Sequence, residues 1–250
     1  MVRDDQGRTW TFGNPNGLSN IELGELLVHG EVTVIGQMPF SSNGTFLVSV
    51  EAEVGSVCAI YKPLRGEAPL WDYPDGLYRR EVAAYELSDL LGLNLVPCTI
   101  AREAGFGIGS VQVTVDADFE QHYFTLRDRH DLADRFRELC VFDLISNSGD
   151  RKSGHVLVDA DDRIWAIDNG LSFHEEDKLR TVIWDFARES FNPAVQSVLE
   201  RFDAQHMSER LDGLISEHEQ QALIERVDQL VHINEFPSPE SRYRLPYPMV

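Results

Sequence analysis

Cysteine is scarce in this sequence, and its placement excludes two common uses of the residue. The three cysteines lie far apart, each in an apolar context, in the segments SVCAIY, LVPCTI and ELCVFDL. An odd and scattered set of this kind is neither a disulfide framework nor a zinc site. We therefore expect Cys58, Cys98 and Cys140 to be reduced core residues of a cytoplasmic protein.

Long hydrophobic runs are also missing. No segment approaches the roughly 18 consecutive apolar residues of a membrane-spanning helix, and the start MVRDDQGRTW lacks the apolar core of a secretory signal. Positive charge is in short supply, with 22 Lys and Arg residues against 42 Asp and Glu and a formal net charge of −20. The negative electrostatic field of such a chain disfavours binding to nucleic acid and to anionic membranes, which require a local basic patch. The sequence therefore predicts no nucleic-acid partner and no stable membrane association.

The predicted secondary structure changes character near residue 116. Alternating apolar residues predict strands before that point, at 31–37, 45–53, 56–63, 93–103 and 107–116. Helices are predicted at 20–30, opened by a capping box of Ser19 and Glu22, and at 77–92. Beyond it the pattern predicts mostly helices, at 131–147, 181–188, 192–203 and 216–231, followed by a proline-rich tail that is frayed or orders on docking. The fold class is therefore α+β, with a β-rich half at residues 1–116 and a mostly helical half at 117–250.

The stretch from Phe142 to Phe173 gathers charged side chains around a predicted hairpin. HVLVD and RIWAID are strand-like runs separated by an Asp-Asp turn, which places His155 roughly opposite Asp168. Asp150 lies in the loop just before the hairpin. Two converging carboxylates repel each other unless a divalent cation lies between them. The pattern therefore suggests a Mg²⁺ or Mn²⁺ site, and a solvated hairpin with surface aspartates is the alternative.

A lysine occupies an apolar strand upstream of this stretch. Lys62 lies in CAIYKP, where a charge is costly unless it is paired, and Glu81 on the following helix is within reach. The alternative is a surface lysine whose amine stays in water. A strand lysine, a helix glutamate, a loop aspartate and an aspartate after a hairpin, in this order, are the parts of a kinase fold.

Five segments resemble the phosphatidylinositol 3/4-kinase superfamily, most of all the type II phosphatidylinositol 4-kinases. They are YKPLRGE (61–67), LGLNLVPCT (91–99), GSVQVTV (109–115), NSGDRKSGH (147–155) and AIDNGLSF (166–173). The chain also resembles a group of uncharacterised actinobacterial proteins labelled phosphatidylinositol kinase-like. The resemblance implies a bilobal protein-kinase-like fold in which residues 1–116 form the N-lobe and residues 117–250 the C-lobe of one catalytic unit.

The resemblance also implies a role for each matching residue. Asp150 corresponds to the catalytic aspartate, and Asp168 corresponds to the metal ligand. The residues that would contact ATP are the phosphate-binding Lys62 with its partner Glu81, the phosphate-loop residues Ser41, Ser42, Asn43 and Gly44, and the adenine-binding segment 112–115 with Gln112, Val113 and Val115.

Two departures from the family pattern bear on activity. The phosphate loop is not GxGxxG, so its role follows from position alone. His155 stands where the family has an asparagine as second metal ligand, so the resemblance implies that His155 takes the place of that ligand. Imidazole suits Mn²⁺ better than Mg²⁺. Lys152, which follows the aspartate–arginine pair, offers a point charge to the transferring phosphoryl group.

These features predict an ATP-dependent phosphotransferase that uses Mg²⁺ or Mn²⁺. The expected acceptor is a hydroxyl of a soluble protein or small molecule, because the net charge of −20 disfavours a phosphoinositide in an anionic membrane. Two alternatives remain. The first is a nucleotide-binding pseudokinase or scaffold, and the second is an enzyme with the same fold that transfers a nucleotidyl group.

Overall fold

The computed structural model describes residues 2–3, 9–39, 43–239 and 244–250. It divides into two compact units, the first made of Met1–Val82 and Pro97–Ala117 and the second of Ala83–Val96 and Asp118–Val250. The boundary runs through one helix, α2 (Leu77–Leu90). The predicted division at residue 116 into two lobes of one catalytic unit stays a prediction.

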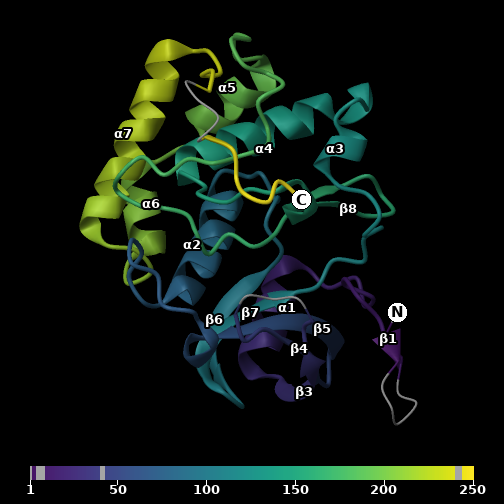
Figure 1. Cartoon of the computed structure of the whole chain (residues 1–250). Helices are drawn as coiled ribbons and strands as arrows, with labels where there is room; N and C mark the ends of the chain where they lie inside the picture. Colours follow the sequence, from purple (N-terminus) through teal and green to yellow (C-terminus); the bar gives the residue numbers. More distant parts are fainter. Residues whose placement is uncertain (1, 4–8, 40–42, 240–243) are drawn as a thin grey trace. The chain divides into compact units, whose positions relative to one another are not determined.

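The first unit is built on a five-stranded antiparallel sheet with the strand order β3-β4-β5-β7-β6 (Figure 1). The strands are β3 (Glu31–Gln37), β4 (Phe46–Ala52), β5 (Gly55–Pro63), β6 (Thr99–Ala104) and β7 (Gly107–Val113), and a separate pair joins β1 (Val2–Arg3) to β2 (Thr9–Trp10). Helix α1 (Asn20–His29) begins with the predicted capping box, in which Ser19 and Glu22 satisfy each other's backbone amides.

The second unit contains most of the helices and one hairpin. Its elements after α2 are α3 (Tyr123–Leu126), α4 (Ala133–Ser146), β8 (Val156–Val158), β9 (Ile164–Ala166), α5 (Pro193–Glu200), α6 (Ala204–Leu211) and α7 (Glu217–Ile233). One continuous apolar core fills this unit and includes the fully buried Phe136, Phe142 and Phe173. The predicted α+β class is confirmed, and all three cysteines are buried and free as expected. None of the described helices is long and apolar enough to span a membrane.

Three secondary-structure predictions were wrong. Residues 93–98 do not join a strand, because the amides of Leu95 and Val96 donate to the hydroxyl of Ser88 instead of a ladder partner. Residues 181–188 are not helical, since Thr181 pairs in a β-bridge with Arg151. The predicted helix at 192–203 ends at Glu200, and α6 follows it as a separate helix.

The proline-rich C-terminal segment lies on the second unit over the part that the structure describes. The backbone amides of Thr181 and Ser153 donate to the carbonyl oxygens of Arg244 and Met249, at 3.0 and 2.8 Å. Figure 1 shows the end of the chain beside β8. The segment therefore bonds directly to the loop that precedes the hairpin.

Candidate active site

Lys62 and Glu81 form an ion pair within the first unit. Lys62 lies on β5 with 23% of its side chain exposed, and its amine bonds to the carboxylate of Glu81 on α2, whose side chain is only 3% exposed. A carboxylate buried this deeply is strongly destabilising without a cation. The alternative of an amine left in water is therefore wrong. The phosphate-binding role of Lys62 stays a prediction.

Two glycines hold the described end of the predicted phosphate loop. Ser41 and Ser42 lie outside the described residues. The amide of Gly44 donates to the carbonyl of Gly66 at 2.8 Å, and a Cβ atom at Gly66 would lie 2.6 Å from the carbonyl oxygen of Gly44. The side chain of Asn43 accepts from the amide of Ala68 at 2.9 Å. The loop is therefore fixed by close backbone approach, and Gly66 is a partner that sequence reasoning missed.

The predicted adenine-binding segment offers few free backbone donors. The side chains of Gln112, Val113 and Val115 are buried, and the Gln112 amide group donates to Thr99 at 2.8 Å. The backbone amides of Val113 and Thr114 already donate to carbonyl oxygens within the first unit, at 2.9 and 3.0 Å. An adenine ring would therefore need the carbonyl groups of this segment or the amide of Val115.

Asp150 and Lys152 lie in the loop that leaves α4. The helix ends at Ser146, and the left-handed conformation of the next residue, Asn147 (φ 54°, ψ 52°), turns the chain into this loop. The amine of Lys152 lies 3.1 Å from the carboxylate of Asp150. Burial raises the pKa of Asp150, the bond to Lys152 opposes that shift, and the negative charge of Asp168 adds to it. A partly buried carboxylate with a raised pKa is suited to accepting a proton.

Asp168 follows the hairpin in a strained backbone conformation. The strand register pairs Val156 with Ala166, so Ile167 faces His155, one residue from the predicted alignment with Asp168. Asp168 has φ 57°, which turns it out of the strand, and its side chain is 54% exposed. A left-handed residue other than glycine is uncommon and often marks a functional position.

The ring of His155 connects Lys152 with Asp168. Its Nδ1 atom accepts from the amide of Lys152 at 3.4 Å, and its Nε2 atom lies 3.4 Å from a carboxylate oxygen of Asp168. An Nδ1 atom that accepts leaves the proton on Nε2, facing Asp168. Binding of a cation by Nε2 would need the other tautomer and the loss of the 3.4 Å bond. This geometry favours His155 as a donor that orients Asp168 over its predicted role as a ligand.

The buried side chain of Arg151 connects the loop of Asp150 with the segment of Asp168. Its side chain is fully buried, and Nε lies 3.0 and 3.3 Å from the two carboxylate oxygens of Asp143 on α4. Its two terminal nitrogens donate to the carbonyl of Ile167 at 2.7 Å and to the side chain of Asn169 at 2.5 Å. These residues flank Asp168 on both sides, while Asp150 and Lys152 flank Arg151. One buried guanidinium therefore fixes the two sets of predicted site residues relative to each other.

Sequence reasoning missed the partners of Arg151. Thr181 completes the network, since its hydroxyl donates to Asp143 at 2.9 Å. The signal for Asp143 was present, because an aspartate inside the apolar run LCVFDLIS requires a partner if the helix is buried. Asn169 lies in the segment AIDNGLSF, and the resemblance assigned it no role.

The residues of the second unit fit a cation that is shared with phosphate. Among the described residues, no group of three or more His, Cys, Asp or Glu side chains is arranged to hold a metal ion alone. Mg²⁺ is commonly bound through one or two carboxylates together with substrate phosphates. Asp150 and Asp168 are close enough for the charge of one to raise the pKa of the other, and such repulsion is relieved by a cation.

Comparisons with solved structures define the class of fold. The proinflammatory kinase CtkA of Helicobacter pylori aligns over 84% of this chain and 94% of its own, with a TM-score of 0.56 and 13% identity. The structure of hydra Fam20 with sugar aligns over 85% of this chain and 87% of its own, with a TM-score of 0.52 and 10% identity. The chain therefore has a bilobal, protein-kinase-like fold, as predicted.

Sequence comparison shows the family. No protein-family model matches the chain. Protein Rv2133c of Mycobacterium tuberculosis (strain ATCC 25618 / H37Rv) is 36% identical over 260 aligned positions, which cover 89% of this chain and 94% of the relative. The chain belongs to the same family as Protein Rv2133c. The narrower resemblance to the phosphatidylinositol 3/4-kinases is not confirmed and stays a prediction.

Proposed function

We propose that the chain is an atypical kinase that transfers the γ-phosphoryl group of ATP to a hydroxyl group. The observation that carries the proposal is the arrangement around Arg151, which fixes a carboxylate suited to proton transfer next to a second carboxylate suited to a cation. The ion pair of Lys62 and Glu81 in a kinase-like first unit supports nucleotide binding.

The proposal gives each group one task. Lys62, held by Glu81, binds ATP phosphate, and Asp168 holds Mg²⁺ or Mn²⁺ with His155 orienting it. Asp150 accepts the proton of the acceptor hydroxyl as oxygen attacks the γ-phosphorus atom and ADP leaves. Lys152 stabilises charge on the transferring group. The cation would neutralise charge on the phosphates.

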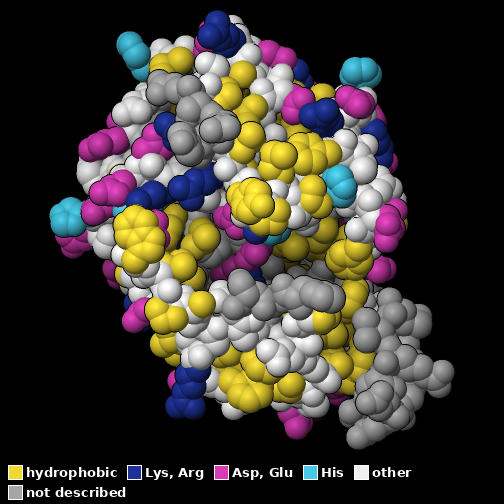
Figure 2. Space-filling view, viewed as in Figure 1, with side chains coloured by type: hydrophobic (Ala, Val, Ile, Leu, Met, Phe, Trp, Pro, Cys, Tyr) yellow, Lys and Arg dark blue, Asp and Glu magenta, His cyan; other side chains and the backbone are white. Residues whose placement is uncertain are grey.

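A soluble protein or small molecule is the proposed acceptor. The chain carries a net charge of −20, and on the face seen in Figure 2 the described Lys and Arg side chains are interspersed with Asp and Glu side chains. The net negative charge would repel an anionic membrane, and the described residues of this face show no basic cluster that would offset it. A pseudokinase or a nucleotidyl transferase remains the alternative, and both are separated from a kinase by the measurement that closes the Discussion.

Lysine labelling tests nucleotide binding without knowledge of the acceptor. The chain has only three lysines, Lys62, Lys152 and Lys178. An acyl-phosphate derivative of ATP acylates lysines next to its phosphates. We expect labelling of Lys62, Lys152 or both, detected by peptide mass spectrometry and suppressed by excess ATP. Lys178, which pairs with Glu176, serves as an internal control. Equal labelling of all three lysines that ATP does not suppress would contradict the proposal.

The pH dependence of turnover should report Asp150. A general base must be ionised, and burial raises the pKa of Asp150, so the rate should fall as the pH drops through that raised value. Replacing Lys152 with methionine removes the cation that favours the ionised form, so the acidic limb of the profile should move to higher pH. Initial rates between about pH 4 and 8 measure the shift. A limb that stays in place, or that moves equally in Lys178→Met, would exclude Asp150 as the base.

A further inference from the structure

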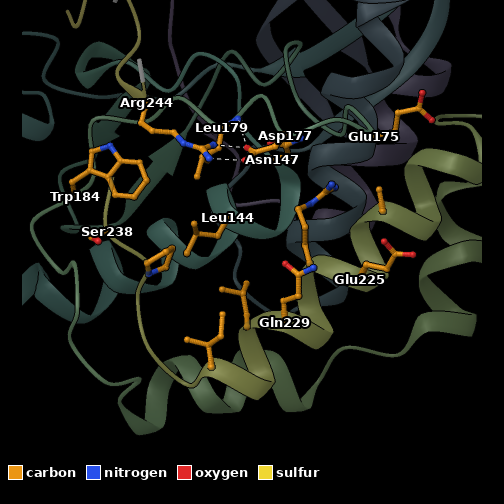
Figure 3. A pocket seen from close by; sticks show the side chains of 15 residues that line it. Leu144, Asn147, Glu175, Asp177, Leu179, Trp184, Glu225, Gln229, Ser238 and Arg244 are labelled. Atoms are coloured by element: carbon orange, nitrogen blue, oxygen red, sulfur yellow. Dashed lines mark hydrogen bonds and ion pairs between the residues drawn. The ribbon is translucent and has the colours of Figure 1, made fainter. Parts of the chain in front are cut away.

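The second unit contains a cavity of about 370 Å³ that the proposed reaction does not use. It is lined by the end of α4, the segment that follows β9, helix α7 and the C-terminal segment. Figure 3 shows Leu144, Leu179 and Trp184 around it, with Arg244 bonded to Asp177 at its edge. The lining combines apolar side chains with polar and charged ones in similar numbers, and a cavity of this size is typical of binding sites.

Two buried donors of the lining have no acceptor among the described residues. They are Nε1 of Trp184 and Nη2 of Arg226. The other two nitrogens of Arg226 donate to the carbonyls of Ile145 at 2.9 Å and His174 at 3.4 Å. Burial lowers the pKa of Arg226 to about 10. Buried donors without acceptors are costly and uncommon, so the cavity is suited to an occupant that carries hydrogen-bond acceptors.

The charges around the cavity disfavour a strongly anionic occupant. The carboxylates of Asp177, Glu219 and Glu225 already favour the Arg226 cation, so a phosphate group would meet their repulsion. Glu175 and Glu225 line the cavity and are exposed. The occupant should therefore combine neutral acceptors, an apolar side chain and a neighbouring cation. A peptide segment with Lys or Arg next to an apolar residue has all three.

We propose that this cavity binds a short basic and apolar peptide segment of a partner protein. Main-chain carbonyls accept from Trp184 and Arg226, and the apolar side chain packs on Leu144 and Leu179. The basic side chain lies near Glu175 and Glu225. The net charge of −20 favours the encounter with basic segments. The role of such a partner as phosphoryl acceptor rests on the proposed function, whereas the binding itself does not.

The position of the cavity connects it with the catalytic loop. Asn147, which ends α4 and starts that loop, lines the cavity, and its side-chain amide donates to the carbonyls of His174 and Glu176 at 2.8 and 2.7 Å. The bound peptide therefore contacts the same segment that holds the start of the loop, which places a docked partner next to the residues around Asp150.

A positional-scanning library of N-acetylated, C-amidated pentapeptides, applied to the full chain, tests the proposal. We expect selection of an apolar residue next to Lys or Arg, and a fluorescence change that Trp184→Phe removes.

Arg226→Gln should weaken binding of the selected peptides by about tenfold to a hundredfold. The unfolding transition of this variant is checked, because the carbonyl of Ile145 loses a donor. The double variant Glu175→Lys/Glu225→Lys alters exposed positions only. It should weaken basic peptides by about tenfold and shift the preference to Asp or Glu.

Three results would overturn the proposal. They are no selection at any library position, a preference that survives the charge reversal, and binding of inorganic phosphate that depends on Arg226. Peptide selection by a chain that neither binds nor turns over ATP would support the docking site and refute the kinase. ATP turnover without peptide selection would support the kinase and refute the docking site.

Discussion

Replacing Arg151 with methionine should lower the free energy of unfolding by about 3–5 kcal/mol, because it leaves the carboxylate of Asp143 buried without its cation. Burial already raises the pKa of Asp143, and Arg151 opposes that shift. Without the guanidinium, Asp143 takes up a proton at higher pH, so the loss of stability should shrink as the pH falls. Urea unfolding of the variant and the wild type at neutral and acidic pH measures both effects.

Two further variants separate the buried pair from a general effect of arginine. The double variant Arg151→Met/Asp143→Leu removes both charges and should recover much of the stability, but it should not recover turnover, because Ile167 and Asn169 lose their donor. Arg129→Met breaks exposed ion pairs with Asp131 and Asp162, so it should leave stability nearly unchanged. Equal stability of Arg151→Met and Arg129→Met would contradict the structural role of the network.

Replacing Asp150 with asparagine should reduce turnover by about 10²- to 10⁴-fold, because the amide cannot accept the proton of the acceptor hydroxyl. Nucleotide affinity should change little, since Asp150 acts on the acceptor in the proposed reaction. Single-turnover rates and an equilibrium titration with a fluorescent ATP analogue separate the two quantities.

Asp161→Asn is the matched control for Asp150→Asn. Asp161 lies in the exposed turn of the β8–β9 hairpin, so its replacement removes a carboxylate from the same region without touching the proposed site. It should retain full turnover. A loss that is equal in the two variants, or a fully active Asp150→Asn variant, would remove Asp150 from the mechanism.

Local signals predicted much of the first unit. The capping box at Ser19 predicted the start of α1, and the alternating run EVTVIGQ predicted β3 with both of its ends. The apolar residues at 181–188 have helical spacing, and this misled the prediction. In the structure Val182, Ile183 and Phe186 are buried in the core, while backbone pairing with Arg151 keeps the start of the segment extended. The spacing of apolar residues alone cannot distinguish a buried helix from an extended segment that buries the same residues.

The charged residues of the candidate site were predictable from the sequence, but the hydrogen bonds that hold them in place were not. Lys62 and Glu81 were expected to pair, since a lysine in a buried strand requires a partner. The bonds of Arg151 join α4 to residues on both sides of Asp168, and two of its acceptors, the Ile167 carbonyl and the Asn169 side chain, are uncharged groups that no sequence pattern marks as partners. The same holds for the cavity around Trp184 and Arg226, whose walls come from four separate parts of the chain.

The most direct test of the proposed kinase is ATP turnover by the purified chain with Mg²⁺ and with Mn²⁺, compared between the wild type and Asp168→Ala. Intact-protein mass and nucleotide products are recorded in the same reactions. We predict cation-dependent formation of ADP, with any mass gain equal to one phosphoryl group, and loss of both in the variant. Nucleotide binding without turnover in either cation, a mass gain of a nucleotidyl group, or turnover that survives Asp168→Ala would contradict the account.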